Sequence, residues 1–423
     1  MQFVEPFLGD FVGTIMASRL IPLQSNPQRS LALFEYDSLA DPAEVSRLRD
    51  VLCQVFRLPT SYWESYFARI GHENFRVLRQ SNRLVGGLAI YQMGQWFGGQ
   101  TLGLAGIAAV GIAPEVRSAG AATHLMSSTL TELYRQGVPL SALYPSTQRL
   151  YRKVGYEQAG NRYLYQLPLD SIGLRAVRNE VERIDNSGHE QYHELARTRA
   201  QRTNGNLERN RGMWERCVSN PYDRKPVYRY LFGSPAYPDG YLFFYQDADK
   251  PGPYSLYVRD MMASSPAAAR HLWSFLGSHR SMAEKVVWSG PAAEPLLMLT
   301  DELEAEVVGH DRWMLRIVDV RKALAQRGYP PTCAAELHFE IQDDIIEANQ
   351  GRIVLRVSDG VGEVSQGGRG ELRTHVRGLS PLFSGLFSPA QLQATGHIEG
   401  RDAAITTAAS IFAGPEPWMP DMF

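Results

Sequence analysis

The sequence has few cysteines, no long basic run and no long uninterrupted apolar stretch, and each shortage excludes a class of protein. Its three cysteines in 423 residues, Cys53, Cys217 and Cys333, are far apart and odd in number. This argues against a disulfide framework and against a Cys-x-x-Cys zinc site. Lys and Arg (43) nearly balance Asp and Glu (45), and no basic run is interleaved with aromatics, so a nucleic-acid partner has little support. The longest apolar stretch, Leu102–Pro114, is Gly-rich and too short to span a bilayer.

The N-terminal residues and the absence of a metal-binding motif indicate the compartment and the kind of cofactor to expect. Glu5 and Asp10 stand where a signal peptide would have Lys or Arg, so we expect a soluble protein in the reducing cytoplasm. No His-Glu-x-x-His motif is present, and we expect neither a metal nor a membrane as a partner. Residues 1–30 are interpreted as an N-terminal extension, with residues 22–30 as its linker.

Hydrophobic patterning divides the rest of the chain into three blocks, at residues 31–170, 171–328 and 329–423. The first block predicts the order strand, two helices, three strands, helix, strand, helix, strand. The second block repeats parts of this order. The third alternates short strands with turns, adds helices and ends in a proline-rich tail. The predicted strands are 31–36, 75–80, 84–93, 102–112, 138–144, 161–169, 227–232, 240–246, 254–261, 285–290, 312–320, 337–341, 352–357 and 371–376, and the C-terminal helices are 380–387, 389–395 and 402–412.

The most informative stretch is Ala108–Ala122, where an apolar strand runs through a short turn into a helix. The first N–H groups of a helix have no intrahelical partner and carry the positive end of the helix dipole, so they can bind a pyrophosphate. Arg117 adds positive charge, and the small Gly120 and Ala122 let phosphate oxygens approach the main chain. Neither a P-loop nor a Gly-x-Gly-x-x-Gly fingerprint is present. On the motif alone, an ordinary surface turn stays an open alternative.

The second block has a corresponding junction at Arg259–Pro266 that lacks these features. It contains no Gly, and Asp260 would repel a phosphate group. Ser265-Pro266 opens the following helix in the usual way for a capped helix start. We interpret the second block as a related unit that has lost its cofactor site.

The junction Val110–Gly120 resembles the acetyl-CoA loop of the GNAT acetyltransferases. Leu150–Tyr156, with its Tyr-x-x-x-Gly-Tyr spacing, and the chain ending at Phe423 extend the likeness. From about residue 30 to 423 the sequence resembles the enhanced intracellular survival (Eis) acetyltransferase family. The resemblance implies an α/β (α+β) chain with tandem GNAT domains, the second degenerate, followed by a sterol-carrier-protein-like α+β domain. It also implies a homo-hexamer.

The resemblance implies a role for residues on both sides of the strand-to-helix junction. Ser118 and Ala119 replace two arginines that are frequent in the family loop, so the backbone amides should carry more of the phosphate affinity. The implied acetyl-CoA-binding residues are Val110 and Ile112 for the pantetheine arm, and Arg117, Ser118, Gly120, Ala121 and Ala122 for the pyrophosphate.

The implied catalytic groups are Tyr151 as general acid and the terminal carboxylate of Phe423 as general base. An amine is protonated near neutral pH, so a carboxylate must take its proton before it attacks a thioester. A phenol can return a proton to the leaving thiolate, and no covalent enzyme intermediate is needed when both substrates bind together. The implied amine pocket contains Tyr62, Trp63 and Tyr66.

Purely structural interpretations of the same residues remain open. Tyr151 could be a core aromatic, and Tyr62, Trp63 and Tyr66 could simply pack against the sheet. The leading hypothesis is an acetyl-CoA-dependent N-acetyltransferase of a small polycationic, aminoglycoside-like amine, attracted by the acidic residues Glu416 and Asp421. The alternatives are a protein-lysine acetyltransferase, and a binding protein with a vestigial GNAT block that carries an apolar ligand in its C-terminal domain.

Overall fold

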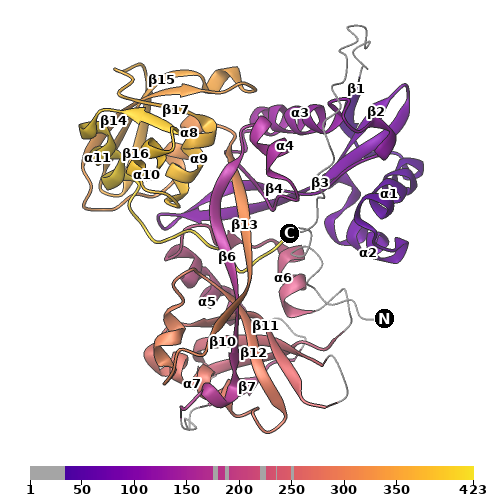
Figure 1. The fold of residues 1–423 in the computed structure, drawn as a ribbon, viewed down its shortest axis with the longest axis vertical. Coiled ribbons are helices and arrows are strands. Elements are labelled where there is room, and N and C mark those ends of the chain that lie inside the picture. The colour runs from indigo at the N-terminus through magenta and orange to yellow at the C-terminus, as the bar shows by residue number, and fades with distance from the viewer. Residues whose placement is uncertain (1–33, 175–179, 186–189, 220–224, 235, 249–251) are drawn as a thin grey trace, which may run out of the picture.

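The computed structural model describes residues 34–423 except 175–179, 186–189, 220–224, 235 and 249–251. The expected N-terminal extension lies outside the described residues, as do the first three residues of the predicted strand 31–36. Figure 1 shows the first block at the upper right, the third block at the upper left and the second block below them. The C-terminus lies in the middle of the molecule, between the first and second blocks.

The first block has the element order that the sequence predicted. α1 begins after Asp41, whose side chain accepts a hydrogen bond from Ala43 N–H (2.8 Å), with Pro42 in the first turn. The block contains β1 (Phe34–Ser38), α1 (Pro42–Phe56), α2 (Thr60–Ile70), β2 (Phe75–Gln80), β3 (Arg83–Phe97), β4 (Gln100–Ile112), α3 (Ala121–Arg135), β5 (Leu140–Leu143), α4 (Gln148–Lys153) and β6 (Glu157–Pro168).

The second block carries four elements that the sequence analysis overlooked, β7, α5, β8 and α6. α5 is polar, but its buried Tyr192, Leu195, Ala196 and Ala200 follow helical spacing, so the signal was present. The block contains β7 (Val181–Arg183), α5 (Glu190–Gln201), β8 (Leu207–Glu208), α6 (Arg211–Val218), β9 (Tyr228–Ser234), β10 (Tyr237–Asp247), β11 (Tyr254–Ala263), α7 (Pro266–Gly277), β12 (Ala283–Gly290) and β13 (Glu306–Ile317).

The two blocks exchange strands, which the sequence analysis did not anticipate. β13 of the second block lies between β5 and β6 of the first, antiparallel to both. β6 in turn pairs with β12 of the second block. In the described part of the chain, both blocks therefore share one 13-stranded sheet with the order β1-β2-β3-β4-β5-β13-β6-β12-β11-β10-β9-β7, and β8 attached to β3. In Figure 1, β6 and β13 run through the middle of the molecule and join its upper and lower parts.

Alternation along the strands of the first block builds two cores on opposite faces of the sheet. Leu104 of β4 packs on the face covered by α1 and α2, whereas Ala105 packs on the face covered by α3 and α4. Leu140 and Leu143 of β5 divide in the same way. Any ligand that passes between β4 and β5 would therefore connect the two faces.

The third block is a five-stranded sheet, β16-β15-β14-β17-β18, packed with helices. The helix predicted at 380–387 was placed too late, because α9 begins at Val376 directly after β17 and contains Pro381. The segment after the Asp359-Gly360 turn forms a strand, β16, that was not predicted. The block contains α8 (Val320–Gln326), β14 (Ala335–Gln342), β15 (Gly351–Ser358), β16 (Val361–Gln366), β17 (Leu372–His375), α9 (Val376–Ser384), α10 (Pro389–Ala394), β18 (Ile398–Gly400) and α11 (Asp402–Ile411).

A buried ion pair fixes the third block to the first two. Arg316 of β13 is fully buried and donates to both carboxylate oxygens of Asp343, at 2.7 Å each. Arg316 also donates to the Val154 carbonyl (3.0 Å), and Asp343 accepts from Asn349 Nδ2 (2.8 Å). Burial alone would raise the pKa of Asp343, but Arg316 and the hydrogen bonds outweigh it and hold the pKa below its usual range.

Candidate active site

Strands β4 and β5 separate in the middle of the first block and leave β4 backbone available. Their parallel register pairs Leu104, Ala105 and Gly106 with Leu140, Ser141 and Ala142. β4 then continues to Ile112 beyond the end of β5. The register against β3 shifts between Gly87 and Ala89, and Ala109 opposite has a φ of +51°, so β4 carries a bulge where it leaves β5. Val110 and Ile112, the expected pantetheine-binding residues, lie in this free portion of β4.

The turn after β4 leads to the exposed N-terminus of α3. Gly120 is the N-cap residue, with φ +86°, and no side chain caps the helix. The first helical hydrogen bond runs from His124 N–H to Gly120 O (2.9 Å). The N–H groups of Ala121, Ala122 and Thr123 therefore have no intrahelical acceptor.

The same turn has room for an anion beside those amides. A Cβ built on Gly120 would meet nothing within 4 Å, so the space over the helix N-terminus is open. Ser118 has a φ of +66°, and Arg117 is exposed, with no ion-pair partner among the described residues. These residues fit the pyrophosphate of a coenzyme A group, which would find backbone amides and one free guanidinium.

Tyr151 on α4 lies in the core on the α3 and α4 face, together with Val110, Ile112 and Ala121. It is 5% exposed, and its ring meets that of Tyr156 edge-on with centroids 6.1 Å apart. Burial raises the pKa of Tyr151 to about 12, although a hydrogen bond with Ser146 opposes the shift. The phenol therefore keeps its proton at neutral pH, as a general acid requires.

A hydrogen-bond chain ties this aromatic pair to the point where β4 and β5 separate. Ser141 Oγ donates to the Ala105 carbonyl (2.9 Å). The Tyr156 hydroxyl lies 2.7 Å from Ser141 Oγ and must be the donor, because the single serine proton is already used. Tyr156 is therefore a structural residue that fixes the end of β5, and Tyr151 stands beside it.

The C-terminal tail, residues 413–423, runs from the third block to the opposite face of the same strands. Trp418 forms a parallel bridge with Asn161 of β6, and Trp418 N–H donates to Asn204 O (3.0 Å). At its end the Phe423 ring lies against Gly106, where a Cβ would come within 2.7 Å of it. Gly106 is the last residue of β4 that pairs with β5, so the tail ends at the opening between the strands.

Aromatic rings connect the expected amine pocket to the tail. The Trp63 and Tyr66 rings are 5.2 Å apart, and Tyr62 stacks on Tyr66 at 6.1 Å. Tyr66 contacts Tyr91 of β3 at 6.3 Å, and Tyr91 contacts Phe423 at 6.1 Å. Trp63 and Tyr66 are also core residues of the α1 and α2 face, so the same side chains can pack against the sheet and line the expected pocket.

A cavity opens beside α2 on this face. It has a volume of about 480 Å³ and is lined by Ser65, Ala68 and Arg69 of α2 and by Glu215 and Ser219 at the end of α6. A second cavity, of about 690 Å³, lies on the other side of α6 between Trp214 and the side chains of α5. The smaller cavity therefore lies between α2 of the first block and α6 of the second.

The structure groups the expected site residues in two sets. The cofactor loop and Tyr151 lie on the α3 and α4 face, and the aromatic residues of α2 and Phe423 lie on the α1 and α2 face. The opening between β4 and β5 lies between them. The sequence analysis missed Gly106, Tyr91 and Tyr144; the Tyr144 ring lies 5.8 Å from that of Phe423. Only the tail's folded position, which the sequence does not encode locally, reveals them.

The second block has no comparable anion site at its strand-to-helix junction. The N-terminus of α7 is already capped, because Ser265 Oγ accepts from Ala268 N–H (3.0 Å). Asp260 is 3% exposed and binds Arg199 and Arg209, so it serves an internal ion-pair network and does not face a cofactor. The second domain is degenerate, as the sequence indicated.

One electrostatic expectation was wrong. Asp421 was expected to attract a cationic substrate, but it is 6% exposed and its carboxylate binds Arg209 at 2.8 Å. Its charge is neutralised inside the protein. Glu416 is exposed and accepts a hydrogen bond from Asn161 Nδ2 (3.3 Å).

The described ranges contain neither a cluster of potential metal ligands nor a helix that could span a membrane. No group of three or more His, Cys, Asp or Glu side chains in those ranges is close enough to hold a metal ion. Among the helices described, none is long and apolar enough to cross a bilayer.

Three family models match consecutive parts of the chain. An acetyltransferase (GNAT) domain matches residues 38–159, a second acetyltransferase (GNAT) domain matches 205–317, and a sterol carrier protein domain matches 320–420. These matches, with the fold and the helix N-terminus described above, define the class of protein as an N-acetyltransferase with a sterol-carrier-type C-terminal domain.

Similar proteins agree with this class. The crystal structure of a GCN5-related N-acetyltransferase from Anabaena variabilis is 43% identical, with a TM-score of 0.89 over 92% of this chain and 100% of that chain. An uncharacterized N-acetyltransferase of Streptomyces griseus is 28% identical over 349 residues, 77% of this chain and 83% of the relative. N-acetyltransferase Eis of Mycobacterium tuberculosis is 24% identical over 319 residues, 71% of this chain and 75% of Eis.

The chain belongs to the GCN5-related N-acetyltransferase (GNAT) family and has the three-domain composition of the Eis-like members. The sequence-based resemblance and the fold class are thereby confirmed. The roles of single site residues and the domain boundaries stay predictions.

Proposed function

We propose that this protein transfers an acetyl group from acetyl-CoA to an amino group of a small polycationic acceptor of the aminoglycoside type. The observation that carries the proposal is the pairing of an open, uncapped helix N-terminus on one face of β4 with the end of the tail on the other. Acetyl-CoA supplies the thioester that is attacked. Arg117, Ser118, Gly120, Ala121 and Ala122 would hold its pyrophosphate, and the free β4 backbone at Val110 and Ile112 would hold its pantetheine arm.

In this mechanism the terminal carboxylate of Phe423 accepts a proton from the acceptor ammonium group, directly or through water. The freed amine attacks the thioester carbonyl, and a backbone N–H of β4 can stabilise the oxyanion. The carbon–sulfur bond then breaks, and the Tyr151 phenol donates its proton to the leaving thiolate. Proton removal by a carboxylate and proton donation by a phenol each contribute about 10²–10⁴-fold.

The environment of the tail supports a cationic acceptor. The rings of Tyr66, Tyr91 and Phe423 contact one another in sequence from α2 to the tail, and Tyr66 and Tyr91 are buried. The faces of such rings attract ammonium groups by cation–π interaction. Tyr91 also has a buried hydroxyl without a hydrogen-bond partner, which a polar acceptor could supply. We propose that the acceptor enters from the cavity between α2 and α6.

The proposal includes the finer expectations from the resemblance, which are a homo-hexamer and a cytoplasmic location. Light scattering of the purified protein tests the assembly, and fractionation of cells that express a tagged chain tests the location.

The activity test is release of free CoA thiol from acetyl-CoA in the presence of a panel of amines. The panel contains aminoglycosides, linear polyamines, and a lysine-containing peptide that represents a protein acceptor. We expect turnover with the polycationic small molecules and acetylation of their amino groups by mass spectrometry. Tight CoA binding without transfer to any amine would refute the proposal, and transfer to the peptide alone would favour a protein-lysine acetyltransferase.

A further inference from the structure

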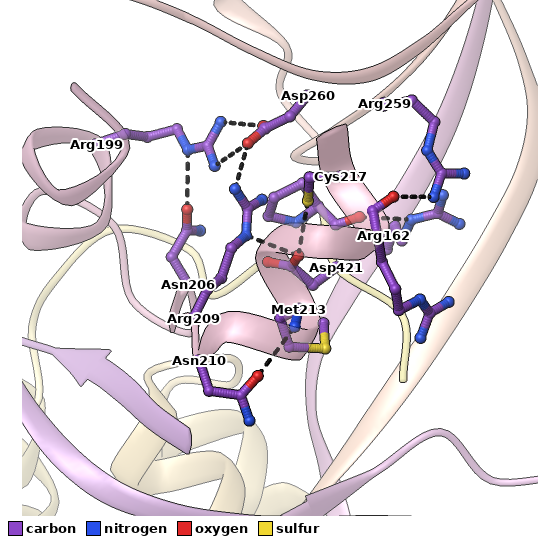
Figure 2. A network of polar contacts seen from close by, with 12 residues as sticks. Arg162, Arg199, Asn206, Arg209, Asn210, Met213, Cys217, Arg259, Asp260 and Asp421 are labelled. Carbon is purple, nitrogen blue, oxygen red and sulfur yellow. Dashed lines mark hydrogen bonds and ion pairs between the residues drawn. The ribbon is translucent and has the colours of Figure 1, made fainter. Parts of the chain in front are cut away.

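A buried network of four charged side chains connects the second domain to the end of the tail. This charge network consists of Arg199 on α5, Arg209 before α6, Asp260 on β11 and Asp421 in the tail (Figure 2). Arg199 binds Asp260 at 2.7 Å, and Arg209 binds Asp260 with one side of its guanidinium and Asp421 with the other. The network therefore ends two residues before Phe423.

The network is balanced in charge, and three of its four side chains are almost closed to water. The side chains of Arg209, Asp260 and Asp421 are 3%, 1% and 4% exposed. Burial alone would raise the pKa of Asp260, but the positive charges of Arg199 and Arg209 outweigh it and hold the pKa below its usual range. Tyr241 adds a hydrogen bond to Asp260 (2.8 Å), and the Cys217 thiol lies 3.9 Å from Asp421. Asp421 is thus anchored to a rigid, ionised centre.

Hydrogen bonds to backbone carbonyl groups also hold the tail at Asp421 and before it. Tyr144, directly after β5, donates to the Asp421 carbonyl (2.7 Å), and Arg162 donates to the Pro420 carbonyl (3.3 Å). Asn206 donates to the Trp418 carbonyl (2.8 Å). A Cβ on Gly205 would come within 3.1 Å of that carbonyl, so the chain runs close to the tail.

The donors to the Asp421 carboxylate come from the second domain. The second domain, which has no cofactor site of its own, thus supplies the charged side chains that hold the tail at the candidate active site of the first domain. Its Asp260 stands at the strand-to-helix junction that corresponds to the cofactor loop.

From these contacts we infer that Arg209 and Asp421 are positioning residues for acetyl transfer: the degenerate domain serves as the clamp that places the Phe423 carboxylate beside the opening of β4 and β5. The inference rests on the proposed function, in which that carboxylate is the base. Loss of the clamp should lower kcat with little change in KM for acetyl-CoA, because the cofactor loop lies on the other face of the sheet.

The test compares three full-length variants with the wild type. Asp421→Asn keeps the size of the side chain and removes the charge that Arg209 binds. Tyr144→Phe keeps the ring against Phe423 and removes only the hydrogen bond to the tail backbone. Because it leaves the buried charges intact, it tests the inference even if Asp421→Asn does not fold. Asp343→Asn is the matched control, because it alters an equally buried Arg-bound carboxylate whose hydrogen-bond partners lie outside the tail. kcat, KM for acetyl-CoA, melting temperature and the rate at which carboxypeptidase releases Phe423 are measured for each.

We expect Asp421→Asn and Tyr144→Phe to lower kcat by about 10–100-fold, since misplacement of a reacting group by about 1 Å costs on that order. Both should release Phe423 several-fold faster than the wild type while acetyl-CoA KM stays unchanged. Asp343→Asn should lower the melting temperature without either effect.

Wild-type kcat in both tail variants, or a fall in kcat with wild-type release of Phe423, would overturn the inference. So would an equal fall of kcat in Asp343→Asn, because general destabilisation would then explain the result. If the wild type transfers no acetyl group at all, the proposed function fails, whereas the release assay still decides whether the clamp holds the tail.

Discussion

Gly106 and Phe423 meet at the point where β4 and β5 separate. A Cβ on Gly106 would lie 2.7 Å from Phe423 Cε2, and 2.5 Å from Met93 Cε. The absence of a side chain at residue 106 therefore creates the place that the last residue of the tail occupies. The relationship links a strand of the catalytic domain to a residue more than 300 positions later in the chain.

Gly106→Ala should displace the Phe423 ring and lower kcat by about 10²-fold. The atoms that the new methyl meets are ends of flexible side chains, so the melting temperature should change little. Steady-state kinetics and thermal denaturation check both expectations. Gly103→Ala in the same strand is the matched control, because its Cβ would make only an ordinary contact of 3.5 Å with Pro139. Equal kinetics for the two variants would contradict the placement of Phe423.

Gly120→Ala should raise KM for acetyl-CoA more than it lowers kcat. The added methyl enters the open space over the α3 N-terminus, where phosphate oxygens would approach, and the left-handed φ of +86° adds about 1 kcal/mol of strain. Gly396→Ala separates the two effects, because Gly396 has φ +70° and equally open surroundings in the third domain. Calorimetric titration with CoA should show weaker binding for Gly120→Ala alone. Unchanged CoA affinity would remove this loop from the cofactor site.

Tyr151→Phe should lower kcat by about 10²-fold or more, with CoA affinity unchanged, because only the proton donor is lost. The control is Tyr134→Phe on α3, which lies against the same core. Stopped-flow measurement of acetyl transfer at neutral pH compares the two variants. Full activity in Tyr151→Phe would assign the phenol a packing role.

The raised pKa of Tyr151 also predicts how stability depends on pH. Burial raises this pKa from the usual 10 to about 12, so the folded protein holds the proton more tightly than the unfolded chain does. The resulting stabilisation is fully present below pH 10 and is lost as the pH rises toward 12. The wild type should therefore lose stability relative to Tyr151→Phe across that window in urea denaturation. A constant difference between the two proteins from pH 8 to 12 would contradict a buried phenol.

Asp343→Ala should destabilise the protein by about 3–5 kcal/mol, because it leaves the fully buried Arg316 guanidinium without its counter-charge. Chemical denaturation measures the loss. Glu371→Ala, which removes the partner of the exposed Arg369, should leave the unfolding free energy unchanged within error. Similar losses in both variants would show that the Arg316 pair does not fix the third domain.

The sequence was sufficient for features that local chemistry determines. Ser265-Pro266 marked a helix start, and the turn from Arg117 to Gly120 marked the open helix N-terminus. These signals are short-range, since a cap or a left-handed glycine acts on its own turn.

Long-range features could not be predicted in this way. Nothing in the local pattern of β13 indicates that it lies between β5 and β6, because an apolar strand could pair equally well with strands of its own block. Asp421 looked like a free surface charge, since its partner Arg209 is 212 residues away in sequence. The tail was expected at the active site only from the family resemblance, and the residues that hold it became visible only with the fold.

The most direct test of the account is to add one glycine after Phe423 and measure acetyl transfer to the best amine of the panel. The extension would move the terminal carboxylate by about 3.5 Å while leaving the charge network and the cofactor loop unchanged. The account predicts that kcat falls by about 10²-fold or more while CoA affinity and melting temperature stay at wild-type values. Unchanged kcat in the extended protein would contradict the terminal carboxylate as the base.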